Sequence, residues 1–278
     1  MGRNGQQGAG NSRRDWPGAW CIVVVLQASL PGYARISGDG IRGLAIESSR
    51  LGVEEILGKE TLYEFAARQP DARKFKGRMP AYAISLPQNG GDVVVRHAMR
   101  GGALGRTGSD LFFPPTRALR ELINSMRLRV AGVPTPEVVA FVTYRAGPVF
   151  RRSDVATREI KDGHDLSVVL KEVPSGEHRA QCLTAAGTLL ALLARVGAHH
   201  PDLNVRNVLI TWDDAHGARA HVLDVDRIRF HVPADPMVSK ANFERLERSL
   251  KKVRERENLA ITDAEIESIR AAASSHAK

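Results

Sequence analysis

The sequence predicts an α+β fold with two lobes, the first rich in β-strands and the second mainly helical. Short apolar runs separated by turn residues fill the first half, as where Tyr82–Leu86 and Val93–Arg96 flank the turn signal PQNGG. Longer segments with helical spacing fill the second half, above all Gly176–Val196. Strands and helices that segregate along the chain predict two layers or lobes with a cleft between them.

Changes in composition and in predicted secondary structure divide the chain into three parts. Residues 1–19 are rich in Gly, Gln, Asn and Arg and are expected to form a disordered tail. Residues 20–158 are expected to form an N-terminal extension and the β-rich lobe, and residues 159–278 the helical lobe. The apolar run Cys21–Leu26 is too short to span a bilayer and is predicted to be a buried strand, although Arg13 and Arg14 before it leave a secretory signal as an alternative.

Individual elements follow from spacing and turn residues. The GDGIRG segment matches the G-x-G-x-x-G pattern of dinucleotide-binding loops, but strand character continues after it, so a hairpin turn is favoured. The expected strands are Tyr33–Ile36, Leu44–Glu47, Val138–Tyr144, Val149–Arg151, Val208–Trp212 and His221–Val225; the expected helices are Val53–Arg68, Thr116–Val130 and a terminal helix with Phe243, Leu246 and Leu250 on one face.

The composition of the chain limits the kinds of partner that it is expected to bind. The chain has 278 residues and a formal net charge of +9, which favours an anionic partner such as a phosphorylated ligand or an anionic membrane surface. No nucleic-acid recognition motif is present, and an aromatic content of 5% offers few stacking platforms, so no nucleic-acid partner is expected. The two cysteines, Cys21 and Cys182, lack metal-ligand spacing and indicate a reducing compartment.

The stretch HHPDLNVRNVLI carries the most specific pattern, His-x-Asp-Leu-x-x-x-Asn before an apolar run. This is the spacing of a kinase catalytic loop, in which Asp202 accepts or orients the proton of a substrate hydroxyl group and Asn207 offers a carbonyl oxygen to Mg²⁺. An Asx-rich turn after a helix is one alternative. A zinc site is another, although no helical His pair and no nearby cysteine supports it; its ligands would be His199, His200, Asp202 and His221. His200 is expected to brace the backbone.

The other parts of such a site occur in the right order. Asp224 follows the short strand in HVLDVD and is expected to be the second Mg²⁺ ligand. Upstream, Arg96 ends an apolar strand and is expected to hold the α- and β-phosphates of ATP. Glu121 is the best candidate to orient Arg96 from a helix, and Gly77 lies in a reduced glycine loop.

These motifs resemble the lipopolysaccharide kinase (Kdo/WaaP) family, and within it the 3-deoxy-D-manno-octulosonic acid (Kdo) kinases. The resemblance covers DLN in the catalytic loop, LDVDR, VRHAMRGG, a hinge-like TREIKDGHDL and a last helix RLERSLKKVR. It implies a protein-kinase-like fold and ATP-dependent phosphorylation of Kdo on lipid A, at the cytoplasmic face of the bacterial inner membrane. The residues it assigns are Asp202 as base, Asn207 and Asp224 as Mg²⁺ ligands, and Arg96 at the phosphate-binding strand position. With Arg96, the residues Glu121, Gly77 and Glu159 complete the set expected around the nucleotide.

Two alternatives keep this fold. In one the acceptor differs, for example a core heptose or another small molecule. In the other the protein is a non-catalytic pseudokinase. This interpretation is motivated by Arg96 in place of the usual lysine and by a glycine loop that lacks the usual three glycines. The presence of Asp202, Asn207 and Asp224 argues against that second alternative.

Overall fold

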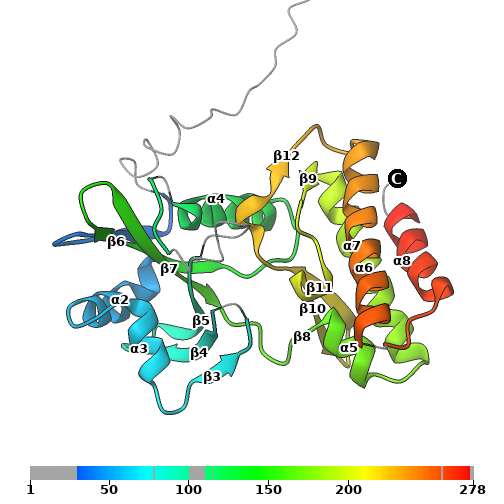
Figure 1. Cartoon of the computed structure of the whole chain (residues 1–278), viewed down its shortest axis with the longest axis horizontal. Coiled ribbons are helices and arrows are strands. Elements are labelled where there is room, and N and C mark those ends of the chain that lie inside the picture. The colour runs from blue at the N-terminus through cyan, green and yellow to red at the C-terminus, as the bar shows by residue number, and fades with distance from the viewer. Residues whose placement is uncertain (1–29, 78, 100–109, 115, 258, 276–278) are drawn as a thin grey trace, which may run out of the picture.

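The chain folds into two lobes that lie side by side, which confirms the predicted α+β, two-lobed class (Figure 1). The computed structural model describes residues 30–77, 79–99, 110–114, 116–257 and 259–275. The expected tail over residues 1–19 and the expected strand over residues 21–26 lie outside these ranges.

The first lobe is built on one antiparallel sheet of seven strands in the order β1-β2-β6-β7-β5-β4-β3. The hairpins expected at Tyr82–Arg96 and Val138–Arg151 are both present, and the second is longer than expected. The strands are β1 Tyr33–Gly38, β2 Ile41–Ile46, β3 Arg73–Phe75, β4 Ala81–Leu86, β5 Gly91–His97, β6 Val138–Ala146 and β7 Phe150–Arg158.

The GDGIRG segment forms the predicted hairpin between β1 and β2, with Tyr33 opposite Ile46 and Gly38 opposite Ile41. No helix opens at its last glycine, because Gly43 and Leu44 continue β2 and pair with β6. The dinucleotide-loop alternative is therefore wrong. The hairpin extends the sheet at the β6 edge, away from β5.

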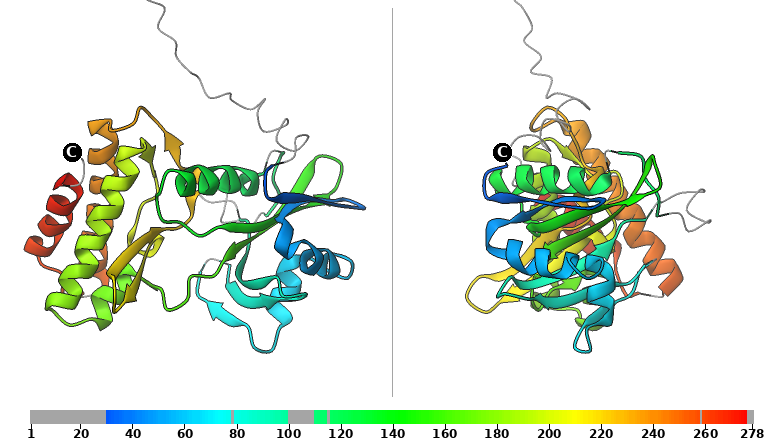
Figure 2. Two further views of the ribbon diagram at one scale, coloured as in Figure 1. Left: turned by 180° about the vertical axis from the view of Figure 1, so that it is seen from behind. Right: turned by 90° about the vertical axis from the view of Figure 1, so that its left-hand side faces the viewer.

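Helices cover both faces of this sheet (Figures 1 and 2). On one face lie α2 (Arg50–Leu57) and α3 (Leu62–Arg68), where the sequence predicted a single helix over Val53–Arg68. That prediction is wrong because Thr61 starts a new helix: its side chain accepts a hydrogen bond from the Glu64 N–H, and the Glu64 carboxylate accepts one from the Thr61 N–H. Such a reciprocal capping box favours a helix start over helix continuation.

The other face is covered by α4 (Arg117–Val130), which matches the predicted helix. Its apolar side packs Leu119 and Leu122 against Phe141 of β6. Another side of the helix contacts the second lobe, where the Asn124 side chain donates hydrogen bonds to the carbonyl oxygens of Val225 (2.7 Å) and Ile228 (3.3 Å). Helix α4 therefore connects the sheet directly to the segment that follows Asp224.

The second lobe is helical around a small β-structure. The long helix α6 is buried at its centre, and Gly187 lets the backbone of α8 approach, since a Cβ atom there would lie 2.5 Å from the Ile269 carbonyl oxygen. The terminal helical region comprises two helices. The elements are β8 His164–Asp165, α5 Leu166–Glu172, α6 Glu177–Arg195, β9 Ala198–His199, β10 Val208–Asp213, β11 Gly217–Val222, β12 Arg229–Phe230, α7 Pro236–Glu257 and α8 Asp263–Ser275, with 3₁₀ turns at Val205–Asn207 and Val225–Arg227. The first lobe has one 3₁₀ turn among its described residues, at Glu47–Ser49.

The lobes meet where the chain leaves β7. The sheet ends at Arg158, and residues 159–163 lead into β8, which pairs with β10 beneath the catalytic-loop candidate. We propose the division between the lobes at this point, after residue 158. The β10–β11 hairpin then lies between the carboxylates of Asp202 and Asp224, with Val208 opposite Val222. Asp202 and Asp224 therefore lie before and after one rigid hairpin.

Candidate active site

The segment His199–Asn207 forms a tightly braced loop after β9. The His200 ring is buried between two backbone groups: its Nε2 lies 3.1 Å from the Leu223 carbonyl oxygen, and its Nδ1 accepts the Asp202 N–H at 3.2 Å. Burial lowers the pKa of His200, so the ring is neutral, as these two bonds require. The prediction that His200 braces the backbone is confirmed.

Asparagines fix the rest of the loop. The Asn204 side chain accepts the Arg206 N–H at 2.9 Å and starts the 3₁₀ turn, while the side-chain N–H groups of Asn204 and Asn207 both donate to the Asp202 carbonyl oxygen, at 3.0 and 2.8 Å. The side chain of Asp202 is left partly exposed in the cleft. The loop is therefore a scaffold that presents one carboxylate.

Asn207 and Asp224 have the chemistry of a magnesium site. The Asn207 Oδ1 accepts no hydrogen bond from the described residues, and the Leu223 N–H donates to the Asn207 carbonyl oxygen at 2.9 Å, which ties the two segments together. Asp224 itself has a left-handed backbone, with φ 56° and ψ 51°. Such a conformation is uncommon for a residue other than glycine, although aspartate adopts it more readily than most.

Within the described residues, no group of three His, Cys, Asp or Glu side chains is arranged to hold a metal ion. The zinc alternative with His199, His200, Asp202 and His221 is thus not supported: the His200 ring is occupied by backbone, and the His221 ring lies 3.1 Å from Thr211 Oγ1. Magnesium needs no such cluster, because it is commonly held by one or two protein oxygens plus the substrate phosphates. Asn207 and Asp224 fit that requirement.

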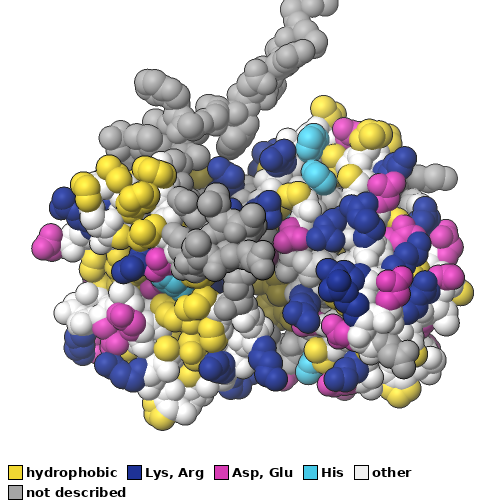
Figure 3. Space-filling model, in the orientation of Figure 1, with side chains coloured by type: hydrophobic (Ala, Val, Ile, Leu, Met, Phe, Trp, Pro, Cys, Tyr) yellow, Lys and Arg dark blue, Asp and Glu magenta, His cyan; other side chains and the backbone are white. Residues whose placement is uncertain are grey.

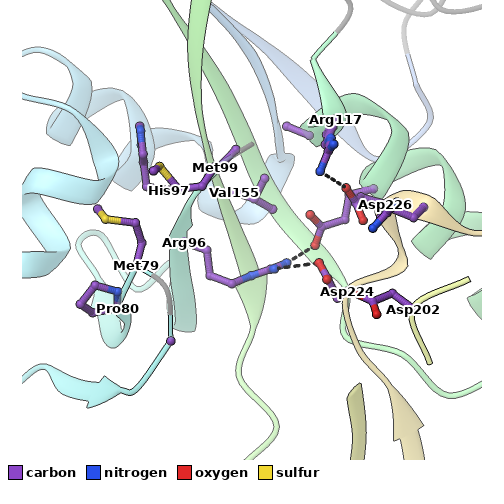
Figure 4. Close-up of a pocket in the computed structure, with 15 residues that line it drawn as sticks. Met79, Pro80, Arg96, His97, Met99, Arg117, Val155, Asp202, Asp224 and Asp226 are labelled. Atoms are coloured by element: carbon purple, nitrogen blue, oxygen red, sulfur yellow. Dashed lines mark hydrogen bonds and ion pairs between the residues drawn. The ribbon is translucent and has the colours of Figure 1, made fainter. Parts of the chain in front are cut away.

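Arg96 lies at the meeting point of the two lobes (Figure 4). Its guanidinium donates to the Glu121 carboxylate of α4 and to Asp224 Oδ1, the latter at 3.4 Å. The Glu121 carboxylate raises the pKa of Arg96, so the guanidinium stays charged. Burial raises the pKa of Glu121 to about 7, although Arg96 acts in the opposite direction. The structure thus brings Arg96, Glu121 and Asp224 together.

Gly77 lies in the connection from β3 to β4, on the wall of the same cleft. A Cβ atom at this position would lie 2.8 Å from the Met79 carbonyl oxygen, so the tight path of the backbone requires glycine. Gly77 and Arg96 line the same pocket, and Gly77 precedes strand β4, which pairs with the strand β5 that carries Arg96.

Glu159 lies directly after β7, on the wall of an adjoining cavity. Its carboxylate is almost fully buried and forms an ion pair with Arg73 of β3. Its N–H donates to the Asp92 carbonyl oxygen at 3.1 Å. The Glu159 carboxylate is thus already paired within the protein, and Glu159 contributes to a ligand site as part of the cavity wall.

Two cavities meet at Arg96, Glu121 and Asp224. The first, which we call the inner cavity, has a volume of about 420 Å³ and extends under β5 toward the connection between the lobes. Its walls are largely apolar, with Ala81, Val94, Val138, Leu209 and Leu223 among them. A flat apolar group with a polar tail fits such a space.

The second, which we call the outer pocket, has a volume of about 590 Å³ and contains Asp202. It is polar: Arg117, Asp226 and Arg227 line it together with the shared residues. Figure 4 shows Arg117 beside Asp226. The Asp226 Oδ2 lies 3.8 Å from Arg117 Nη1, and its buried Oδ1 has no hydrogen-bond partner among the described residues. Burial, reinforced by Asp224, raises the pKa of Asp226 to about 6. The Asp224 carboxylate therefore lies where the apolar cavity and the polar pocket meet, and the Asp202 carboxylate lies in the polar pocket.

The sequence patterns did not identify Arg245 as part of this site. It lies on α7 and its Nη2 donates to Asp202 Oδ1 at 2.7 Å. The sequence placed it only among the basic residues of the last helix. A signal was available in the helical spacing, because Asn242, Arg245 and Ser249 form a polar stripe at positions i, i+3 and i+7.

Comparisons with known proteins agree with this geometry. The sequence model of the lipopolysaccharide kinase (Kdo/WaaP) family matches residues 72–272. Two curated relatives, from Vibrio vulnificus (strain YJ016) and Xanthomonas oryzae pv. oryzae (strain PXO99A), are both named 3-deoxy-D-manno-octulosonic acid kinase. The first is 27% identical over 69% of this chain and 78% of its own length, and the second is 31% identical over 64% and 68%.

A solved structure described as WaaP in complex with acyl carrier protein has a similar fold. It superposes with a TM-score of 0.50 over 78% of this chain and 83% of its own, at 17% sequence identity. The matched family region begins just before β3 and ends within α8, so it includes every candidate site residue from Gly77 to Asp224.

Proposed function

Because the chain belongs to the lipopolysaccharide kinase (Kdo/WaaP) family, we propose that it transfers the γ-phosphoryl group of ATP to a hydroxyl group of Kdo in the lipopolysaccharide inner core. The observation that carries this proposal is the convergence on one cleft of Arg96 from the first lobe and Asp202 and Asp224 from the second. The names of the curated relatives support Kdo as the acceptor.

In this proposal ATP occupies the inner cavity. The adenine would lie against apolar side chains such as Val94 and Leu209, near the connection between the lobes. The phosphates would extend past Arg96, whose guanidinium can form charge-assisted hydrogen bonds with them. Gly77 would allow the β3–β4 connection to follow its tight path along the wall of the cleft near these phosphates.

Asn207 and Asp224 would hold Mg²⁺, which neutralises charge on the phosphates when it is bound. The Arg96–Asp224 ion pair lies beside this position. Phosphoryl transfer depends mainly on such positioning and charge neutralisation, because little covalent chemistry is asked of the protein.

The acceptor would bind in the outer pocket, with its hydroxyl group next to Asp202. Its oxygen forms a bond to the γ-phosphorus while the bond from that phosphorus to the β,γ-bridging oxygen breaks, and ADP leaves. Asp202 accepts the hydroxyl proton. The arginines that line the pocket, Arg117 and Arg227, suit an acceptor that carries carboxylate or phosphate groups.

The second lobe offers a basic face to an anionic membrane that carries such an acceptor. Lys and Arg side chains, interspersed with carboxylates, gather over this lobe on the face shown in Figure 3. Several exposed basic residues belong to α7, among them Lys240, Arg248 and Lys251. None of the helices that the structure describes has the length and apolar character needed to cross a bilayer. We propose peripheral contact with the cytoplasmic face of the inner membrane.

The test is a phosphorylation assay with purified protein, Mg·ATP and Kdo-lipid A, read by mass spectrometry. The wild type should add one phosphate to Kdo, and Asp202→Asn should lower the rate by about 10²–10⁴-fold, the usual contribution of a general base. Core heptose acceptors and small sugars serve as parallel substrates. Binding of Mg·ATP without phosphorylation of any acceptor would identify a non-catalytic protein instead.

A further inference from the structure

One face of α7 holds the catalytic loop from behind. The Asn242 side chain accepts the His200 N–H and donates to the Ala198 carbonyl oxygen, both at 2.9 Å. One turn further along the helix on the same face, Arg245 reaches Asp202, and beyond it the Ser249 hydroxyl accepts the Val205 N–H at 3.2 Å. Residues three and four apart lie on one side of a helix, so a single face of α7 contacts the loop along its length.

Arg245 differs from its two neighbours on this face because it contacts a side chain as well as the backbone. Its Nε donates to the Pro201 carbonyl oxygen at 3.3 Å, and its Nη2 donates to Asp202 Oδ1 at 2.7 Å. Among the described residues, it is the one cation in an ion pair with Asp202. We propose that Arg245 is a positioning residue that orients the Asp202 carboxylate for proton transfer, an inference that rests on the proposed kinase function.

The geometry explains how this would work. A carboxylate on a loop can rotate about its side-chain torsions, and each rotation moves the accepting oxygen. The planar guanidinium, anchored at Pro201 and Asp202 together, fixes one carboxylate oxygen of the pair. The other oxygen, Oδ2, accepts no hydrogen bond from the described residues and remains available to an acceptor hydroxyl group. Misplacement of a catalytic group by about 1 Å can lower turnover about 10²-fold.

A purely structural role for this ion pair is less favoured by its exposure. The Arg245 side chain is 29% exposed and the Asp202 side chain 39% exposed, and pairs of this kind contribute little to folding stability. The loop backbone is already held by Asn242 and Ser249. Removal of the guanidinium should therefore leave the fold intact and change the orientation of one side chain.

The experiment compares Arg245→Met and Arg245→Lys with wild-type protein, using full-length chain, Mg·ATP and Kdo-lipid A. Arg245→Met should lower kcat about 10–100-fold, while its Kd for Mg·ATP stays within about twofold of wild type. Arg245→Lys, which keeps the charge but not the planar fork, should recover part of that loss. Arg248→Met, a nearby exposed arginine on the same helix, is the matched control and should keep wild-type kcat.

A double-mutant cycle separates positioning from structure. If Arg245 acts through Asp202, Arg245→Met should cost nothing further in an Asp202→Asn background, measured by single turnover with radiolabelled ATP. A wild-type kcat in Arg245→Met, or an equal loss with and without Asp202, would overturn the inference. Wild-type protein that fails to phosphorylate Kdo-lipid A would overturn the proposed function, and the inference with it. Thermal unfolding of each variant should stay near wild type.

Discussion

Arg96 and Asp224 are 128 residues apart in the sequence, yet Arg96 Nη1 lies 3.4 Å from Asp224 Oδ1 (Figure 4). One residue ends a strand of the first lobe, and the other follows a strand of the second. The pair therefore joins the lobes at the wall that the inner cavity and the outer pocket share.

Replacement of Arg96 should weaken nucleotide binding. Arg96→Met removes the cation from the phosphate position and leaves the buried Glu121 carboxyl without its partner. A charge-assisted hydrogen bond contributes about 1.5–3 kcal/mol, so the Kd for Mg·ATP should rise about 10–100-fold. Isothermal titration calorimetry measures this change. The affinity of Arg96→Lys for Mg·ATP should lie between those of wild type and Arg96→Met, because lysine keeps the charge but cannot bridge Glu121 and Asp224 with separate nitrogens. Equal affinities for all three proteins would contradict the assignment of Arg96 to the phosphate position.

Replacement of Asp224 should impair the response to magnesium. Asp224→Asn removes the charge but tolerates the left-handed backbone, since asparagine adopts that conformation more readily than most residues. Turnover should fall at least about 100-fold, and the Mg²⁺ concentration for half-maximal rate should rise. Asp213→Asn, an exposed carboxylate on the same hairpin, should change neither quantity. An unchanged Mg²⁺ titration in Asp224→Asn would exclude it as a ligand.

Removal of the carboxylate at Asp202 should separate binding from turnover. Asp202→Asn should bind Mg·ATP as wild type does, because Asp202 lines the outer pocket and not the inner cavity. The same substitution should lower kcat by about 10²–10⁴-fold. Calorimetry and single-turnover kinetics on one preparation give both values. A large loss of Mg·ATP affinity would place Asp202 in the nucleotide site instead.

His97 should make the stability of the first lobe depend on pH. Its Nδ1 lies 2.6 Å from Asp154 Oδ1 and its Nε2 lies 3.2 Å from Asp110 Oδ2. Burial lowers the pKa of His97, but the hydrogen bonds and charges of these two carboxylates outweigh it and the net pKa is raised. A raised folded-state pKa means that His97 stabilises the fold fully below about pH 6.5, its unfolded pKa, and progressively less as pH rises through the folded value.

The measurement is the free energy of unfolding by urea between pH 5.5 and 9, for wild type and His97→Gln. The difference between the two proteins should be largest at acidic pH and should shrink as pH rises. Asp110 also pairs with Arg152, at 2.6 Å, so this arginine should be kept in both proteins. A difference that grows with pH would show that His97 is neutral in the folded protein.

Gly187 offers a test of the packing of the second lobe. Alanine has a helix propensity about 1 kcal/mol better than glycine, but a Cβ atom at Gly187 would lie 2.5 Å from the Ile269 carbonyl oxygen. Overpacking costs about 1–3 kcal/mol, so Gly187→Ala should destabilise the protein despite its propensity. Gly58→Ala is the control: its φ is −68° and its nearest contact would be 3.6 Å, so it should be neutral or slightly stabilising. The melting temperatures of both variants relative to wild type, measured by thermal unfolding, test this prediction.

Sequence spacing was sufficient for the elements whose signals are local. Hydrophobic periodicity and turn residues predicted α4, α6 and the hairpins on either side of PQNGG and GDGIRG, because these depend on neighbours a few residues away. Hydrophobic periodicity wrongly predicted one helix over Val53–Arg68. The apolar spacing continues past the point at which Thr61 and Glu64 form a capping box and start a new helix. Local capping prevailed there over periodicity.

The sequence by itself determined the two-lobed class, because strand and helix patterns segregate along the chain. It also determined the order and spacing of Arg96, Asp202, Asn207 and Asp224, because a strand, a loop and a hairpin carry these residues one after another. Only the tertiary structure decided that Arg96 meets both Glu121 and Asp224, that Glu159 is paired with Arg73, and that Arg245 contacts Asp202. These contacts join segments from separate elements, and helix and sheet packing, which no local pattern encodes, sets the distances between them.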